Sequence, residues 1–108
     1  MTMARTLITF PANARRGEII EVKAIVAHEM ETGFRHTQLG EAIPRDIITH
    51  FTCSYNGVEV FSATFYPAIA ANPFISFSTV ATESGTLSFN WIGDNGFSVT
   101  ETAAISVS

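Results

Sequence analysis

The stretch TCSYNGVEVF, residues 52–61, decides the fold, because Asn56-Gly57 separates two alternating runs. Asn-Gly in this setting is a strong β-hairpin signal, since a type I′ turn needs positive φ at both central residues. It predicts strands over 47–55 and 58–66. The pairs expected across a two-residue turn are Tyr55 with Val58, Cys53 with Val60, and Phe51 with Ser62.

The rest of the chain is a series of short runs separated by turn residues. We expect a turn over 13–17, a long irregular hairpin connection over 28–46 and a proline-bracketed crossover over 67–73. The predicted strands are 5–9, 18–27, 47–55, 58–66, 74–82, 86–92 and 97–107, with a second hairpin turn at Asp94-Asn95-Gly96. Alternation places Ile20, Val22, Ala24 and Val26 on one face of 18–27, and Leu87, Phe89 and Trp91 on one face of 86–92. About seven strands in one chain of 108 residues favour a single all-β domain, an immunoglobulin-like β-sandwich. A small closed barrel is the alternative.

The composition narrows the classes of function. Hydrophobic residues make up 46% and charged residues 15%, with nine phenylalanines, so we expect some apolar surface to stay exposed. The net charge is −4 and no basic stripe is present, which disfavours nucleic-acid binding. No apolar run approaches the roughly 18 residues that a membrane span needs.

One face of the central hairpin is a candidate interface. On the face opposite Phe51 and Cys53, alternation places Ile48, Phe61 and Phe65 among polar residues. Contiguous exposed apolar surface usually marks a binding site, so Phe61 and Phe65 are candidate interface anchors. The alternative is that these side chains pack under the 28–46 connection.

The stretch AHEMETGFR, residues 27–35, resembles a metal or acid–base site at first sight. His28-Glu29 begins like the zinc motif H-E-x-x-H, but Thr32 stands at the last position and the segment is not helical. A small β-sandwich metalloprotein enzyme that uses His28, His36 or His50 with nearby glutamates is therefore the alternative function. Cys53 lies mid-strand among aromatic residues, which is typical of a small core residue rather than a nucleophile.

Four stretches of the chain together resemble one known protein family. They are VAHEMETGFR (26–35), IPRDIITHFTCSYNGVEVFSATFYPAIAANPFISF (43–77), ATESGTLSFNW (81–91) and DNGFSV (94–99). In this order and spacing they closely resemble the Z subunit of the Sox sulfur-oxidation carrier complex, SoxYZ. The resemblance covers nearly the whole chain and implies a single SoxZ-like β-sandwich domain over 1–108.

The resemblance implies a noncatalytic binding subunit without a cofactor. In this family the Z subunit forms a heterodimer with a Y subunit, whose C-terminal cysteine arm carries thiosulfate-derived sulfur between Sox pathway enzymes. Those enzymes are implied as transient partners. Neither nucleic acid nor membrane insertion is expected, and a homo-oligomer of the isolated chain stays open.

The residues themselves and the family resemblance indicate different cellular compartments. The residues show no signal peptide and a single cysteine, which favour the cytoplasm. The resemblance implies the periplasm instead, reached by co-export with the partner's twin-arginine signal.

Within the resemblance, the 28–35 segment is the most diagnostic part. We expect Gly33 to permit an unusual turn, and Glu31 and Arg35 to hold the loop together across it. Met30 and Phe34 are the expected adaptable apolar contacts to a partner. The candidate partner-binding residues are His28, Met30, Glu31, Thr32, Gly33, Phe34 and Arg35.

Overall fold

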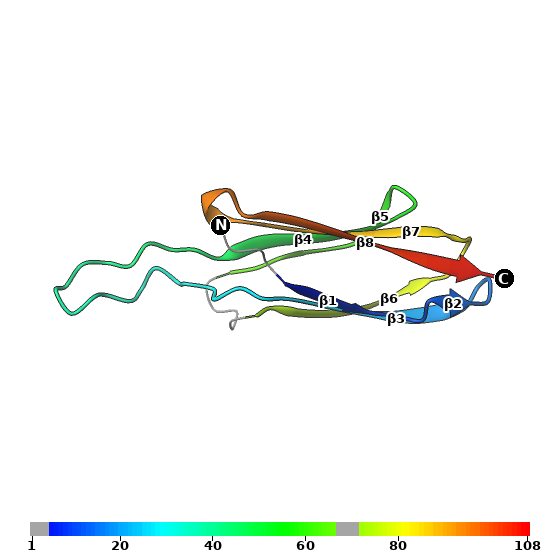
Figure 1. Ribbon diagram of the computed structural model, residues 1–108, viewed down its shortest axis with the longest axis horizontal. Helices are drawn as coiled ribbons and strands as arrows, with labels where there is room; N and C mark the ends of the chain where they lie inside the picture. Colours follow the sequence, from blue (N-terminus) through cyan, green and yellow to red (C-terminus); the bar gives the residue numbers. More distant parts are fainter. Residues whose placement is uncertain (1–4, 67–71) are drawn as a thin grey trace.

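The structure is a computed structural model that describes residues 5–66 and 72–108. Two sheets face each other as a sandwich (Figure 1), which confirms the immunoglobulin-like β-sandwich fold. The described residues include no helix that is long and apolar enough to cross a membrane. The elements are β1 (Thr6–Thr9), β2 (Asn13–Ala14), β3 (Ile19–Val26), β4 (Ile48–Tyr55), β5 (Val58–Thr64), β6 (Phe74–Val80), β7 (Gly85–Gly93), the 3-10 turn η1 (Asp94–Gly96) and β8 (Ser98–Val107).

The smaller sheet has the order β1-β3-β6 and the larger sheet the order β2-β8-β7-β4-β5. The prediction of a simple turn over 13–17 is wrong at its start, because β2 pairs in parallel with the end of β8. The chain thus passes from the smaller to the larger sheet between β1 and β2. Most of the crossover predicted over 67–73 lies outside the described residues.

The central hairpin turns at Asn56 (φ 49°) and Gly57 (φ 83°), as the sequence predicts for a type I′ turn. Tyr55 lies opposite Val58, but farther along the strands the predicted pairs are wrong by one residue. A β-bulge makes Val60 an extra residue that faces no residue of β4. Beyond the bulge, Cys53 pairs with Phe61 and Phe51 pairs with Ala63.

The bulge reverses which side chains of β5 face the core, because side chains alternate between the two faces of a strand. Phe65 is only 7% exposed. Phe61 is partly buried and stacks on Phe77 of the smaller sheet, with ring centroids 4.5 Å apart. A second irregularity, between Ile48 and His50, leaves Ile48 buried. The predicted exposed apolar face with Phe61 and Phe65 is therefore wrong.

The core between the sheets contains a cluster of aromatic rings among aliphatic side chains. Phe51 lies at its centre, with its ring centroid 5.1 Å from that of Trp91 and 6.4 Å from that of Phe89. The predicted alternation in β3 and β7 is confirmed, because their inward side chains are buried. These are Ile20, Val22, Ala24 and Val26 in β3, and Leu87, Phe89 and Trp91 in β7.

Cys53 lies fully inside this core, and burial raises the pKa of its thiol to about 11. The thiolate is the reactive form, so we expect Ellman's reagent to modify the folded protein at least about 100-fold more slowly than a free cysteine near pH 8. Guanidinium-unfolded protein is the control and should react at the ordinary rate. Equal rates in the folded and unfolded protein would contradict the burial of this thiol.

Candidate functional site: the projecting hairpin

The segment between β3 and β4 leaves the sandwich as a long two-armed hairpin, seen in cyan and green at one end of the molecule in Figure 1. The molecule measures 60 × 25 × 19 Å, and the hairpin accounts for much of its length. The two sides of the hairpin pair at isolated bridges, Glu31 with Asp46 and His36 with Ala42. The long hairpin connection predicted over 28–46 is thus confirmed. We call residues 32–44 the arm.

His28 fixes the base of the hairpin. Its Nδ1 accepts a hydrogen bond from the Met30 amide at 2.9 Å, and its Nε2 lies 3.7 Å from the Asp46 carboxylate. Its ring meets Phe97 edge-on, with centroids 4.9 Å apart. The His28 amide also donates to the Asn72 side chain. Each of these contacts is internal to the chain, so His28 shapes the loop in the structure.

Met30 is 4% exposed and belongs to the core. Its backbone has a positive φ of 56°, and its Sδ accepts a hydrogen bond from the Ile48 amide at 3.2 Å. The left-handed backbone at this residue turns the side chain inward while the chain leaves the sandwich. The expectation that Met30 is an apolar contact available to a partner is therefore wrong; it anchors the hairpin instead.

The second anchor, an ion pair between Arg45 and Asp94, was not recognised from the sequence. The two side chains make paired hydrogen bonds of 2.8 and 2.9 Å, and the Ile47 amide donates to the same carboxylate at 3.1 Å. These contacts lower the pKa of Asp94, with the Arg45 hydrogen bonds as the main cause. The sequence suggests Asp94 only as a turn residue, since its partner lies 49 residues away.

Acid should loosen this anchor. Because the pKa of Asp94 is lowered in the folded state, its stabilising effect is complete above the unfolded pKa of about 3.9 and is lost as the pH falls through the folded value. We expect the Ile47 amide signal in nitrogen–proton NMR spectra to titrate with a midpoint below about 3.9. The Asp94→Asn variant should lack this transition. A midpoint at or above the ordinary value would contradict the ion pair.

Glu31 and Arg35 form the predicted pair across the loop. The Arg35 guanidinium donates to both Glu31 carboxylate oxygens, from Nε at 3.1 Å to each and from Nη2 by a further hydrogen bond. These bonds lower the pKa of Glu31 and raise that of Arg35. Gly33 lies between them with a φ of 86°, as predicted, and a Cβ there would meet the Arg45 Cβ at 3.0 Å. The Phe34 amide donates to the Thr32 hydroxyl at 3.2 Å.

Replacing Glu31 with Ala should loosen the arm without unfolding the sandwich, because the pair lies outside the core. We expect faster hydrogen exchange at the Ile43 amide, which donates to the Arg35 carbonyl across the arm. The melting temperature should change little, and elemental analysis should find no metal in either protein. Arg35→Lys is the matched control that keeps the charge and loses the two-pronged geometry. Unchanged exchange in Glu31→Ala would contradict the role of the pair.

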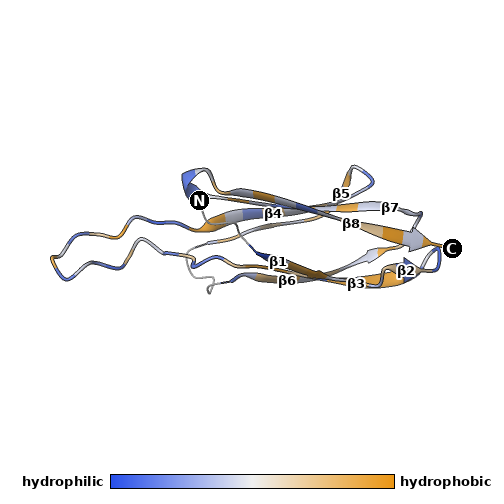
Figure 2. Cartoon of the chain, viewed as in Figure 1, coloured by the Kyte–Doolittle hydropathy of each residue, from blue (hydrophilic) through white to orange (hydrophobic). Residues whose placement is uncertain are grey.

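Two large apolar side chains of the arm, one near its base and one at its tip, are almost fully exposed. Phe34 is 76% exposed and Leu39 is 89% exposed. Apolar and polar segments alternate along the arm in Figure 2. The arm projects from the sandwich, its two sides pair at few points, and its apolar side chains are exposed to solvent. Exposed apolar surface usually marks a binding site, so the arm is suited to binding another protein.

The metal-site alternative is not supported by the positions of the histidines. His28 is held at the hairpin base, His36 lies in the arm, and His50 lies on β4 beside the Thr49 hydroxyl at 3.0 Å. Across residues 5–66 and 72–108, no three His, Cys, Asp or Glu side chains lie close enough to hold one ion. The grouping proposed from the sequence does not form.

Solved structures with the same fold include two kinds of protein. A superoxide reductase (neelaredoxin) from Ignicoccus hospitalis superposes with a TM-score of 0.74 at 17% identity, covering 95% of this chain and 80% of that chain. The sulfur carrier protein SoxY from Chlorobium limicola f thiosulfatophilum superposes with a TM-score of 0.67 at 13% identity, covering 95% and 78%. At these identities the likeness shows the fold alone.

Sequence comparisons give the family. No curated protein sequence matches the chain. The family model described as sulphur oxidation protein SoxZ matches residues 8–104, which include the hairpin, its anchors and both sheets. The chain therefore belongs to the SoxZ family of sulphur oxidation proteins.

Proposed function

We propose that this protein is the noncatalytic binding subunit of a SoxYZ sulfur-carrier heterodimer. In this role it stabilises a Y-type subunit and helps to present that subunit's cysteine arm, which carries the sulfur intermediate, to the enzymes of the pathway. The family assignment supports the pathway and the type of partner. The fold shared with a SoxY structure fits a pair of related subunits.

The observation that carries the proposal is the construction of the hairpin. Its base is fixed by Met30 in the core and by the Arg45–Asp94 pair, while Phe34 and Leu39 stand exposed on the arm. Stable protein interfaces commonly present exposed apolar side chains on a well-supported segment, since preorganisation lowers the entropy lost on binding. Their exposure supports the predicted contact of Phe34 with a partner, and we infer the same role for Leu39.

The likeness to superoxide reductases does not favour an enzyme. It shows the fold alone at 17% identity, and a fold supports many unrelated activities. Cys53, the only cysteine, is buried in the core. Sulfur transfer through a thiol is therefore assigned to the partner and not to this chain.

The proposal includes the periplasm as the working compartment, reached with the folded partner through the partner's twin-arginine signal. The resemblance to the Z subunit is its basis. Cell fractionation with and without the Y-type subunit tests it. This chain should reach the periplasm only when the partner is expressed with an intact signal.

Co-expression with a Y-type subunit from the same operon tests the function itself. We expect one stable complex with one copy of each chain, measured by size-exclusion chromatography with light scattering. An unrelated sandwich protein with the same affinity tag serves as the control for capture. Failure to co-purify, with this chain a stable monodisperse monomer, would contradict the proposal.

A further inference from the structure

The side of the sandwich opposite β2 is formed by β5 and β6, the outermost strands of the two sheets. No strand of the described residues pairs with the outer edge of β6. We propose that this edge binds an extended, uncharged strand of the Y-type subunit, which continues the smaller sheet. The inference rests on the proposed function and adds where the partner binds the sandwich.

The backbone of β6 presents regular bonding groups to its outer edge. Ala81 donates to the Glu18 carbonyl at 2.8 Å, and the Pro73 carbonyl accepts from the Val26 amide at 3.3 Å, so odd-numbered residues bond toward β3. In an antiparallel ladder, alternate residues turn their N–H and C=O groups to opposite neighbours. The residues that bond outward are therefore Phe74, Ser76, Ser78 and Val80.

The edge lacks the protection that exposed sheet edges usually carry. Lysine, proline or a β-bulge normally blocks the pairing of a further strand. Residues 74–82, FISFSTVAT, contain no charge and no proline, and the pairing of β3 with β6 has no register shift. A charged segment placed here would lose hydration, and β6 itself carries no charge to offset that loss. The uncharged edge therefore favours an uncharged strand as its partner.

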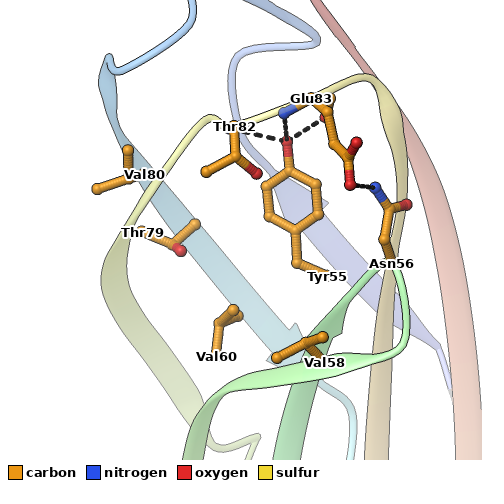
Figure 3. A pocket seen from close by; sticks show the side chains of 8 residues that line it. All are labelled: Tyr55, Asn56, Val58, Val60, Thr79, Val80, Thr82 and Glu83. Carbon is orange, nitrogen blue, oxygen red and sulfur yellow. Dashed lines mark hydrogen bonds between the residues drawn. The ribbon is translucent and has the colours of Figure 1, made fainter.

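A groove beside the edge adds side-chain recognition. Figure 3 shows Val58 and Val60 of β5 facing Thr79 of β6 across a space of about 480 Å³, which Val80 borders from the other side of β6. The Tyr55 hydroxyl forms the rigid end of this groove through three hydrogen bonds to the backbone of 82–83. A strand added to β6 could place one apolar side chain in it. Recognition through backbone bonds with one side-chain pocket is a common mode of strand addition.

The outer face of the smaller sheet would continue the contact. Phe74 and Val80 stand exposed at the two ends of β6. Across the sheet, Phe74 pairs with Ile25, which pairs with Leu7, and the three form an apolar row. Side chains of an added strand would pack beside Phe74 and Val80 as cross-strand neighbours.

The test uses the complex with the Y-type subunit and two variants of the edge. Ser78→Pro removes one outward N–H and leaves the bonds to β3, and Val80→Asp places a charge beside the groove. Each should weaken the complex about tenfold or more, measured by calorimetry. The controls are Ser78→Ala, which keeps the N–H, and Ile92→Asp on the larger sheet, where Ile92 is 47% exposed against 46% for Val80. Both controls should bind like wild type.

Hydrogen exchange gives a second measurement. The amides of Ser76, Ser78 and Val80 should exchange more slowly in the complex than in the isolated chain. A complex that forms normally, tolerates both edge variants and leaves these amides unprotected would overturn the inference while the proposed function stands. A wild-type chain that fails to bind the Y-type subunit would overturn both. Protection by a second copy of this chain, which the Y-type subunit does not displace, would assign the edge to a homodimer and overturn the inference.

Discussion

Replacing Phe34 and Leu39 together with Ser is expected to weaken the complex with the Y-type subunit by about 100-fold, the loss typical of an interface hot spot. Both side chains stand exposed on the arm and make few contacts within the fold. Their removal should therefore leave the free energy of unfolding nearly unchanged. Calorimetric titration of the partner, together with urea unfolding of the isolated chain, separates the two effects.

Ile92→Ser is the matched control for this double variant, because Ile92 is also exposed but lies on the outer face of the larger sheet. It should bind like wild type. If the double variant binds the partner at wild-type affinity, the arm is not part of that interface. The contact would then lie on the sandwich alone.

The Phe51→Ala variant should lose about 3–5 kcal/mol of unfolding free energy, the usual loss for a fully buried phenylalanine. Phe51 is the centre of the aromatic core, with rings of Phe61, Phe77, Phe89 and Trp91 at centroid distances of 5.1 to 6.4 Å. Truncation would leave a cavity that these rigid rings fill poorly. A typical domain has an unfolding free energy of about 5–15 kcal/mol, so this substitution should remove a large part of the stability of the protein.

Urea unfolding of Phe51→Ala and Phe34→Ala measures this effect. The same chemical change at the exposed arm should cost less than about 0.5 kcal/mol. Equal losses in the two variants would contradict the placement of Phe51 in the core.

The sequence predicted the elements whose signals are local. The Asn56-Gly57 turn and the alternation of β3 and β7 depend on neighbouring residues, and each was confirmed. The bulge at Val60 could not be predicted, because an extra residue in a strand shows only in the pairing with its neighbour. Because of that one residue, Phe65 is buried and Phe61 packs against the core, and neither forms the expected interface.

In the candidate site, too, contacts between residues close in sequence could be predicted and contacts between distant residues could not. The pair between Glu31 and Arg35 spans four residues and was expected from the sequence. The bond between Arg45 and Asp94 joins residues far apart in the chain, so only the folded sheets bring them together. Met30 was assigned to the surface because nothing in its neighbours indicates a left-handed backbone that turns it inward.

The arm also acts as a lever. From Met30 to Leu39 the chain can extend about 30 Å at roughly 3.3 Å per residue. A tilt of about ten degrees at the base would therefore carry the tip through roughly 5 Å, by simple geometry on that length. Small rearrangements at Met30 or the Arg45–Asp94 pair, too slight to disturb the sandwich, would be magnified at Leu39. The range of positions that the tip can reach is set at the anchors.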